Sequence, residues 1–164
     1  SGHPTLSVPL DHVTDNQEGR EQIQQDLVDT MRAKNGIGLS ANQIGIGARV
    51  FTMYADVKEK DIMVCFNPKI MAVSEEQILM DEGCLSWPGL WLKVRRPEGI
   101  EVTYEDAKGE LHEKAMFGLE SRIFQHEYDH MEGTDFTKRV SKLKLDRAKK
   151  RLRKVQKRNL TNIV

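Results

Sequence analysis

The stretch Gln125-His126-Glu127-Tyr128-Asp129-His130 contains the pattern His-Glu-x-x-His, and it decides what to expect of the rest of the chain. On an α-helix, residues four apart lie on one face, so His126 and His130 can direct two imidazoles at one metal ion. Glu127 would lie beside them, close enough to take a proton from a water bound to the metal. The stretch therefore predicts a helical metal site for hydrolysis, with a solvated helix that happens to carry two histidines as the alternative.

A catalytic zinc-type site needs a third protein ligand, and Cys84 is the best candidate. Metalloproteases built on such a helix usually take a downstream Glu or His, but no His follows His130. Gly83 before Cys84 and Pro88-Gly89 after it predict a tight, irregular backbone, which suits a ligand at a loop or a strand end. Cys65 has the apolar neighbours of a buried strand, and we expect it to be a core residue.

A glycine-rich stretch at residues 36–45 follows a segment with helical periodicity. It is not a dinucleotide fingerprint, because the glycine spacing differs from G-x-G-x-x-G and no strand precedes it. It is not a phosphate-binding loop either, since no Lys-Ser/Thr pair follows. The glycines would let the backbone approach a ligand closely, and Gln43 would add a side-chain amide donor.

Together these three stretches resemble the motifs of the peptide deformylase family. The matching residues stand in the family's order within residues 20–136: Gly36-Ile37-Gly38-Leu39-Ser40-Ala41-Asn42-Gln43, then Glu82-Gly83-Cys84-Leu85-Ser86, then Gln125-His126-Glu127-Tyr128-Asp129-His130. Ser40 stands where the family usually has Ala, and Met131 replaces a usual Leu, a swap that conserves volume.

The resemblance implies a hydrolase that removes the formyl group from N-formylmethionine at the N-terminus of nascent polypeptides and releases formate. Cys84, His126 and His130 would hold one divalent metal ion, natively Fe²⁺, with Zn²⁺, Ni²⁺ or Co²⁺ as substitutes. Glu127 would be the general base. Two neighbours on the same helix are expected to orient the metal ligands from outside the coordination sphere: Gln125 and Asp129. For Asp129, a solvated charge on the helix is the alternative.

The resemblance also implies how substrate would be held. The side-chain amide of Gln43 and the backbone N–H of Leu85 would stabilise the negative charge that develops on the formyl oxygen. Gly38 and Gly89 would flank the substrate backbone. Three apolar residues are candidates for the pocket of the methionine side chain: Ile37, Leu119 and Ile123. For Ile123, ordinary core packing is the alternative.

Composition is typical of a globular protein, with 38% hydrophobic and 30% charged residues among 164. We expect one catalytic domain over residues 1–164. No apolar run reaches membrane-spanning length, and no signal-peptide pattern is present, so no membrane partner is expected. Two cysteines provide no disulfide framework, which favours a reducing compartment. A cytoplasmic location is expected, and an organellar one is left open.

Hydrophobic periodicity predicts an α+β fold in which mostly antiparallel strands surround a central metal-binding helix, with an additional C-terminal helix. Helices are predicted at 17–34 and 118–131. Strands are predicted at five places: 49–54, 62–66, 69–73, 100–105 and 111–117.

The net charge of zero conceals a strong asymmetry. Residues 137–164 hold 12 Lys/Arg and one acid, whereas the remainder holds 13 Lys/Arg and 24 Asp/Glu. Four apolar residues recur at helical spacing in this basic segment: Leu145, Ala148, Leu152 and Val155. The segment is either a surface helix docked on an acidic body or a helix that binds ribosomal RNA.

Two other functions are compatible with the residues alone. A zinc endopeptidase would use the same helix and cleave internal peptide bonds. A nucleic-acid-binding module would act through the basic segment, and its RNA binding would survive loss of Glu127.

Overall fold

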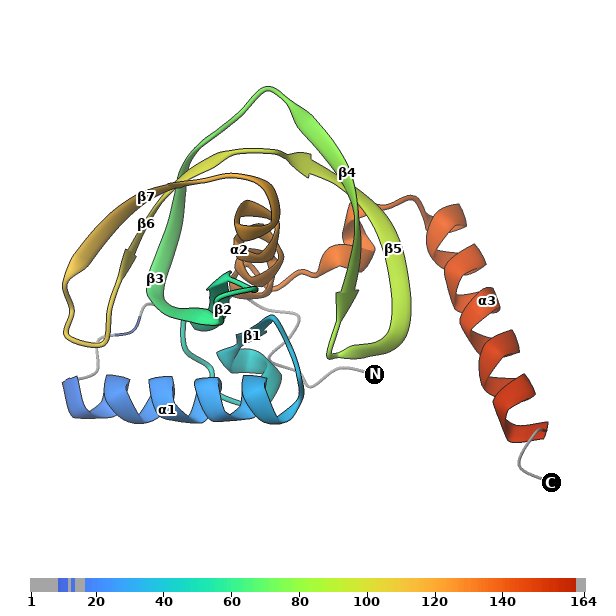
Figure 1. The fold of residues 1–164 in the computed structure, drawn as a ribbon, viewed down its shortest axis with the longest axis horizontal. Coiled ribbons are helices and arrows are strands. Elements are labelled where there is room, and N and C mark those ends of the chain that lie inside the picture. The colour runs from blue at the N-terminus through green and yellow to red at the C-terminus, as the bar shows by residue number, and fades with distance from the viewer. Residues whose placement is uncertain (1–8, 12, 14–16, 162–164) are drawn as a thin grey trace.

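The computed structural model describes residues 9–11, 13 and 17–161, and the helix with the metal motif lies at its centre, with strands curving around it (Figure 1). Three α-helices and two 3₁₀ helices are described: α1 (Gln17–Ala33), η2 (Ala41–Ile44), α2 (Gly118–Met131), η3 (Phe136–Arg139) and α3 (Lys142–Thr161). Among the described residues, none of these helices combines the length and the hydropathy that a membrane span requires.

The strands form two antiparallel sheets. The larger has the order β1-β2-β3-β6-β7, and the smaller is the pair β4-β5. Their bounds are β1 (Gly38–Ser40), β2 (Val50–Asp56), β3 (Asp61–Val73), β4 (Gln77–Cys84), β5 (Trp87–Pro97), β6 (Ile100–Glu105) and β7 (Leu111–Met116). The predicted α+β class, with antiparallel strands around the metal-motif helix and an additional C-terminal helix, is confirmed.

The prediction of separate strands at 62–66 and 69–73 is wrong in one respect, because the two segments form one strand, β3. Pro68 and Asn67 explain the misreading. Proline cannot donate a ladder hydrogen bond, and Asn67 adopts a positive φ of 49°. The pairing of β3 with β6 shifts register between Phe66 and Lys69, so an irregularity accommodates both residues without ending the strand.

The hairpin of β4 and β5 was missed by the sequence prediction, as was the short strand β1. In β5, buried and exposed side chains alternate, with Leu90, Leu92 and Val94 inward. The next buried residue in this alternation is Arg96. Because Arg96 is charged, an analysis of hydrophobic periodicity does not detect the alternation. Cys84 closes β4, which agrees with its predicted place at a strand end.

Helix α2 is held in place by the main core. Phe124 of α2 meets Phe51 of β2 edge to face, with ring centroids 5.0 Å apart. Cys65 is fully buried in the same cluster, as predicted. On the other side, Leu27 and Met31 of α1 are fully buried in a second cluster that includes β2. Helix α2 packs directly against β1 and β2, and α1 packs against the same two strands.

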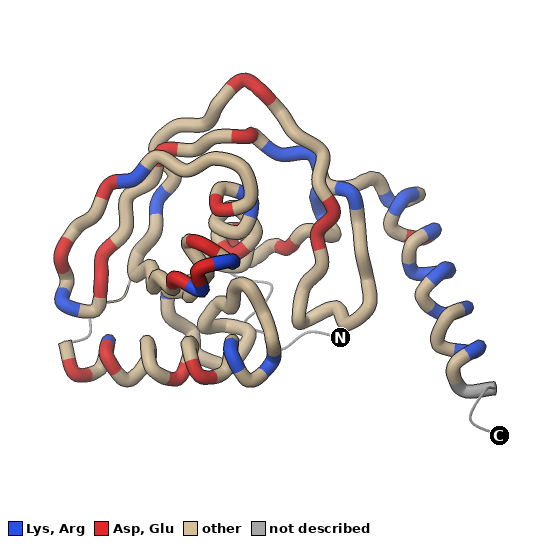
Figure 2. The backbone as a smooth tube through the Cα atoms, in the orientation of Figure 1, with Lys and Arg blue, Asp and Glu red and all other residues tan. Residues whose placement is uncertain are grey.

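Helix α3 docks on β5. Its residues Leu145, Ala148 and Leu152 share a cluster with Leu90 and Phe136. The fourth residue of the predicted apolar stripe is 53% exposed: Val155. The helix begins at Lys142, later than the predicted start of the basic segment at 137, and residues 162–164 lie outside the described part. Figure 2 shows Lys and Arg residues recurring along α3.

Candidate metal centre and active site

Helix α2 directs both histidines of the motif toward one point. His126 and His130 lie one turn apart, with ring centroids separated by 5.4 Å. Both are buried, at 8% and 1% exposure, which is uncommon for histidines without a specific role. The helical spacing therefore produces the converging pair that the sequence predicted.

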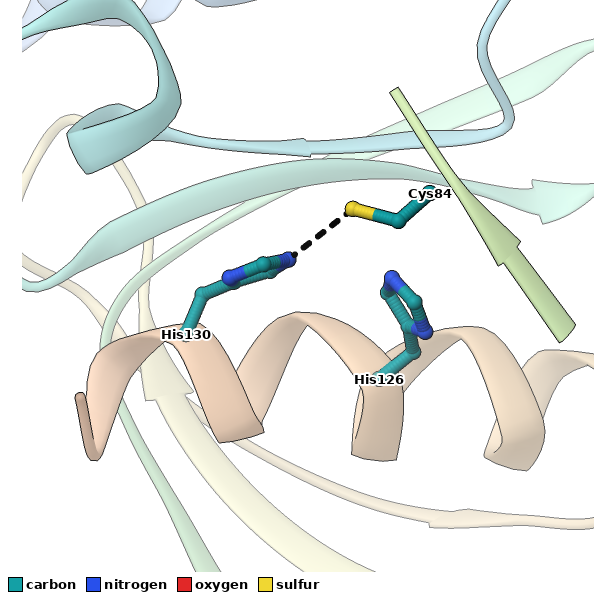
Figure 3. Close-up of side chains that lie close together, drawn as sticks. All are labelled: Cys84, His126 and His130. Carbon is teal, nitrogen blue, oxygen red and sulfur yellow. Dashed lines mark hydrogen bonds between the residues drawn. The ribbon is translucent and has the colours of Figure 1, made fainter. Parts of the chain in front are cut away.

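Cys84 completes a cluster of three donor atoms (Figure 3). Its Sγ lies 3.4 Å from Nε2 of His130, and one donor atom each from Cys84, His126 and His130 all lie within 4.8 Å of one another. A tetrahedral ion with ordinary metal–sulfur and metal–nitrogen bonds would separate sulfur and nitrogen by about 3.6 Å. The three residues therefore fit a single transition-metal ion.

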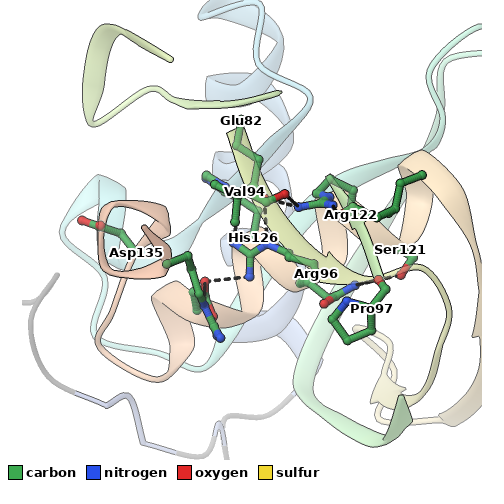
Figure 4. Close-up of polar contacts among 12 residues, drawn as sticks. Glu82, Val94, Arg96, Pro97, Ser121, Arg122, His126 and Asp135 are labelled. Carbon is green, nitrogen blue, oxygen red and sulfur yellow. Dashed lines mark hydrogen bonds and ion pairs between the residues drawn. The ribbon is translucent and has the colours of Figure 1, made fainter. Parts of the chain in front are cut away.

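Glu82 orients His126. Nδ1 of His126 donates to Oε1 of Glu82 over 2.8 Å, which leaves Nε2 to face the other donor atoms. Arg96 donates twice to the same carboxylate, at 2.7 and 2.9 Å, and Arg122 donates once, at 2.7 Å (Figure 4). Burial by itself raises the pKa of Glu82, but the hydrogen bonds from Arg96 and His126 hold it well below its ordinary value. Glu82 is thus a buried, ionised anchor.

The two histidines differ electrostatically. Burial lowers the pKa of His130 to about 4, so its ring is neutral and Nε2 keeps a lone pair for a metal ion. Burial also acts to lower the pKa of His126, but its hydrogen bonds to Cys84 and Glu82 raise it to about 10. The surroundings of His126 therefore favour positive charge at this ring, which a metal ion on Nε2 would supply.

Glu127 points into the same space. Among the side chains that the structure describes, two buried polar atoms have no hydrogen-bond partner: Oε2 of Glu127 and Nδ1 of His130. Burial raises the pKa of Glu127 to about 7, although the neighbouring His126 acts to lower it. A carboxyl group with a pKa near neutrality can both take and return a proton. An unpartnered carboxylate oxygen beside three metal-donor atoms suits a group that acts on water or substrate.

Gly38 makes room for that carboxylate. A Cβ atom built on Gly38 would lie 2.6 Å from Oε1 of Glu127 and 3.0 Å from its Cδ, closer than real Cβ contacts. Gly38 has no positive φ, so its backbone does not require glycine. Glycine is required here because the side chain of Glu127 approaches the backbone of Gly38 closely.

Gln43 is fixed with its amide hydrogens toward the cluster. Its Oε1 accepts hydrogen bonds from the backbone N–H and the hydroxyl of Ser40, both at 2.9 Å. Its Nε2 therefore faces the other way, toward Ser86 Oγ at 3.0 Å and Cys84 Sγ at 3.4 Å. Ser40, which differs from the usual residue in the family motifs, thus contributes to the orientation of this amide.

A cleft of about 410 Å³ opens beside the cluster. Ten of the residues predicted for the site line it: Ile37, Gly38, Gln43, Cys84, Leu85, Gly89, Leu119, Ile123, His126 and Glu127. His130 is not in its lining. The structure therefore brings the predicted residues together in one place.

Other features of the site were missed or misjudged. Gln125 donates to the carbonyl of Pro97 and to Ser121, and Asp129 accepts from Arg96 and Arg139. Gln125 makes no hydrogen bond to Cys84, His126 or His130 among the described contacts, whereas Asp129 is linked to His126 indirectly, through Arg96 and Glu82. Glu82 is the residue that hydrogen-bonds to His126, and its place in the same short motif as Cys84 was the available signal.

Comparisons with known proteins agree with this geometry. The family model described as polypeptide deformylase matches residues 1–146. The peptide deformylase of Thermotoga petrophila is 36% identical over 143 residues, which cover 87% of this chain and 85% of the relative. Peptide deformylase 1 of Pseudomonas syringae pv. tomato is 38% identical over 155 residues, 94% of this chain and 90% of the relative.

Solved structures give the same result. A peptide deformylase from Plasmodium falciparum superposes with a TM-score of 0.84 at 32% identity, covering 96% of this chain and 94% of that chain. One from Synechococcus elongatus, in complex with actinonin, gives a TM-score of 0.81 at 38% identity, covering 90% and 80%. These matches favour deformylation over an endopeptidase or a nucleic-acid-binding module. The chain therefore belongs to the polypeptide deformylase family, the metal-dependent hydrolases that remove the formyl group from N-terminal methionine.

Proposed function

We propose that Cys84, His126 and His130 hold the catalytic metal ion and that Glu127 moves the proton during deformylation of N-formylmethionyl peptides. The observation that carries this proposal is the convergence of three donor atoms within 4.8 Å, two of them on buried histidines, with the partnerless carboxylate oxygen of Glu127 on a residue that lines the same cleft. When bound, the metal supplies a Lewis acid that makes a water molecule nucleophilic near neutral pH.

Glu127 acts as base and then as acid. It takes a proton from the attacking water as the water oxygen bonds to the formyl carbon. It returns the proton to the amide nitrogen as the carbon–nitrogen bond breaks, so formate and a free amine leave. The pKa of Glu127, about 7, suits both transfers because neither protonation state is strongly favoured at neutral pH.

Gln43 and the backbone N–H of Leu85 stabilise the formyl oxygen as it gains negative charge. Support comes from the fixed amide of Gln43, whose Oε1 is held by Ser40 so that Nε2 faces Cys84. Removal of one such donor typically lowers the rate about 10²–10³-fold. We expect Gln43→Ala to lower kcat by that factor with unchanged metal content.

The substrate lies in the cleft with its methionine side chain against the apolar part. Ile123 is buried, whereas Ile37 and Leu119 are each 45% exposed and are available to a ligand. Gly38 and Gly89 flank the substrate backbone, where a larger residue would narrow the cleft. We expect Leu119→Glu to raise KM for formyl-Met peptides far more than it changes the metal content.

The proposed native ion is Fe²⁺, with Zn²⁺, Ni²⁺ or Co²⁺ able to replace it. One thiolate and two imidazoles suit each of these ions, and the family resemblance favours iron. Protein purified without oxygen should be more active with iron than with zinc. Equal activity with both metals would contradict the proposal of iron.

The ligand set is tested with Cys84→Ser, which replaces a soft thiolate with a hydroxyl. We expect the wild-type protein to retain metal through gel filtration and Cys84→Ser to lose most of it, together with formate release. Cys65→Ser serves as the matched control because Cys65 is buried in the core away from the cluster. Retention of metal by Cys84→Ser would remove Cys84 from the ligand set.

We further propose that α3 attaches the enzyme to ribosomal RNA through its outward basic residues. Lys150 and Arg153 are exposed and lie on the side of α3 opposite to its packed stripe. Phosphate binding through such residues weakens as salt rises. We expect the double variant Lys150→Glu/Arg153→Glu to sediment less with ribosomes at low salt, and unchanged sedimentation would refute this attachment.

A cytoplasmic location completes the proposal. Both cysteines are free, which suits a reducing compartment. One relative from Arabidopsis thaliana is named as chloroplastic/mitochondrial, so an organelle is the competing location. A fluorescent fusion expressed in the source cell distinguishes the two.

A further inference from the structure

A second hollow lies between the β4–β5 hairpin and α3, and we call it the α3 groove. It has a volume of about 720 Å³. Leu79, Trp91 and Lys93 line it from the hairpin, and Arg147, Arg151 and Val155 line it from α3. Figure 1 shows α3 standing beside β5 along the side of the molecule where this groove runs. Nothing in the proposed reaction uses it.

The α3 groove is positively charged. Lys144, Arg147 and Arg151 all line it and are exposed. Within the described part of the chain, no acidic side chain forms an ion pair with any of the three. The one acid in the lining is Asp81, which pairs with Lys93 over 3.2 Å. The groove therefore presents three cations whose attraction for an anionic ligand is not cancelled locally.

The walls of the α3 groove are also apolar. Leu79 is 45% exposed, Val155 53% and Trp91 64%, which is high for large hydrophobic side chains. An indole and two aliphatic side chains beside unpaired cations suit a polypeptide better than a phosphate backbone alone, because both acidic and apolar side chains find partners there. Base-stacking aromatics do not follow one another along the groove, as single-stranded RNA would require.

The α3 groove is continuous with the catalytic cleft. Asp81, Gly89 and Trp91 line both hollows. The indole of Trp91 lies over Gly83, where a Cβ atom would come within 3.1 Å of the ring. Trp91 thus forms the rim between the two hollows. The residue that its indole covers, Gly83, directly precedes Cys84 in the sequence. A chain that leaves the cleft over this rim enters the α3 groove.

We propose that the α3 groove binds the part of the formylated polypeptide that follows its first residues, and that it favours acidic side chains there. This inference rests on the proposed function of the neighbouring cleft. Attraction through partly exposed ion pairs is weak for each pair, so two acidic residues should improve kcat/KM on the order of three- to tenfold. Because an ion pair in the groove would be the same in the ground state and in the transition state, the gain should appear in KM and leave kcat nearly unchanged.

The experiment measures formate release from formyl-Met peptides of about ten residues, which span about 33 Å when extended. A Glu-Glu, Gln-Gln or Lys-Lys pair is moved along the peptide. Wild-type protein at low salt should prefer Glu-Glu to Gln-Gln in one window beyond the methionine and should disfavour Lys-Lys there. The preference should decline as salt rises.

Two double variants separate the groove from general charge. Arg147→Glu/Arg151→Glu should abolish or reverse the preference, and Arg147→Gln/Arg151→Gln should reduce it. Lys150→Glu/Arg153→Glu changes the net charge of α3 by the same amount on its opposite side and should keep the wild-type preference. All four positions are exposed, so circular dichroism should show unchanged folding.

Three results would overturn the inference. The first is a kcat/KM that does not depend on the charged pair at any position of the peptide. The second is an unchanged preference for Glu-Glu in Arg147→Glu/Arg151→Glu, and the third is that this variant loses only the binding of an RNA oligonucleotide. Fluorescence anisotropy of labelled peptides measures their affinity for the Glu127→Gln variant, and so tests the preference for Glu-Glu peptides without turnover. Absence of formate from every peptide, with the binding preference intact, would instead contradict the proposed function and leave the groove assigned.

Discussion

Gly38→Ala tests the contact between strand β1 and the proposed base. The new methyl carbon would lie 2.6 Å from Oε1 of Glu127, so the carboxylate must move by about 0.8 Å to restore an ordinary contact of 3.4 Å. A displacement near 1 Å of a catalytic group costs about 10²-fold in rate. We therefore expect kcat/KM for a formyl-Met peptide to fall about 100-fold, equivalent to about 2.7 kcal/mol of transition-state stabilisation.

Stability and metal content should change little in Gly38→Ala. The carboxylate is the end of a flexible side chain, and it moves more easily than the backbone. Where the backbone permits it, Gly→Ala alters the free energy of unfolding by only about 1 kcal/mol. The assays are formate release, thermal unfolding and metal analysis on the same preparations.

Gly47→Ala is the matched control, since a Cβ there meets no atom within 4 Å. It should retain wild-type activity. If Gly38→Ala also retains full activity while Gly47→Ala behaves as expected, the position of Glu127 seen here is not the one used in catalysis. If both variants lose activity equally, the loss comes from glycine replacement in general and the steric reasoning is wrong.

Three further variants have expected outcomes. Glu82→Gln leaves two buried arginines short of a charge partner, so it should lower the free energy of unfolding by about 3–5 kcal/mol, measured by urea denaturation. The same change should weaken metal affinity about 10–100-fold in a chelator competition, because Glu82 orients a ligand; wild-type affinity would contradict that role. Hydrogen bonds from Thr137 and Trp87 lower the pKa of Asp135 against the opposing effect of burial. The contribution of Asp135 to the free energy of unfolding is thus complete above its pKa in the unfolded chain, about 3.9. It is lost as the pH falls through the lower pKa of the native state. Asp135→Asn should remove this part of the dependence of stability on acid pH, and an unchanged dependence would refute the role of Asp135. Phe136 is fully buried between β5 and α3. Phe136→Ala should therefore lower the free energy of unfolding by about 3–5 kcal/mol and shift a single unfolding transition. Two separate transitions would contradict the expectation that residues 1–164 form one domain.

The catalytic helix could be predicted from the sequence because its chemistry and its periodicity coincide. His126 and His130 repeat at the helical interval, and the predicted bounds 118–131 equal those of α2. Cys84, the third proposed metal ligand, could be predicted for a different reason. Cys84 stands among residues that break regular structure, and it proves to end β4 next to the tight connection to β5.

The hairpin that carries Cys84 was not predicted, because its inward face is partly charged. Glu82 and Arg96 are buried and paired with each other, at 5% and 3% exposure. Hydrophobic periodicity registers such residues as exposed, so it fails where a buried ion pair replaces apolar packing. The partners of Glu82 come from β5 and α2, far apart in the sequence, and only the tertiary fold brings them together.

The basic C-terminal segment illustrates the opposite limit. Its apolar stripe correctly predicted a helix, and docking was one of the two alternatives left open; Leu145, Ala148 and Leu152 do pack against the hairpin. The periodicity could not show that Val155 remains exposed, because the length of the partner surface is set by β5 and η3. That exposed end, beside unpaired arginines, is what creates the α3 groove.

The most direct test of the central claim is formate release from a formyl-Met peptide by anaerobically purified protein, with Glu127→Gln measured at equal metal content. Glutamine keeps the size of the side chain but cannot carry the proton. Our account predicts rapid release by the wild-type protein and nearly complete loss in Glu127→Gln. Equal rates in the two proteins would contradict the role of Glu127, and no release by the metal-loaded wild-type protein would contradict the proposed deformylase site.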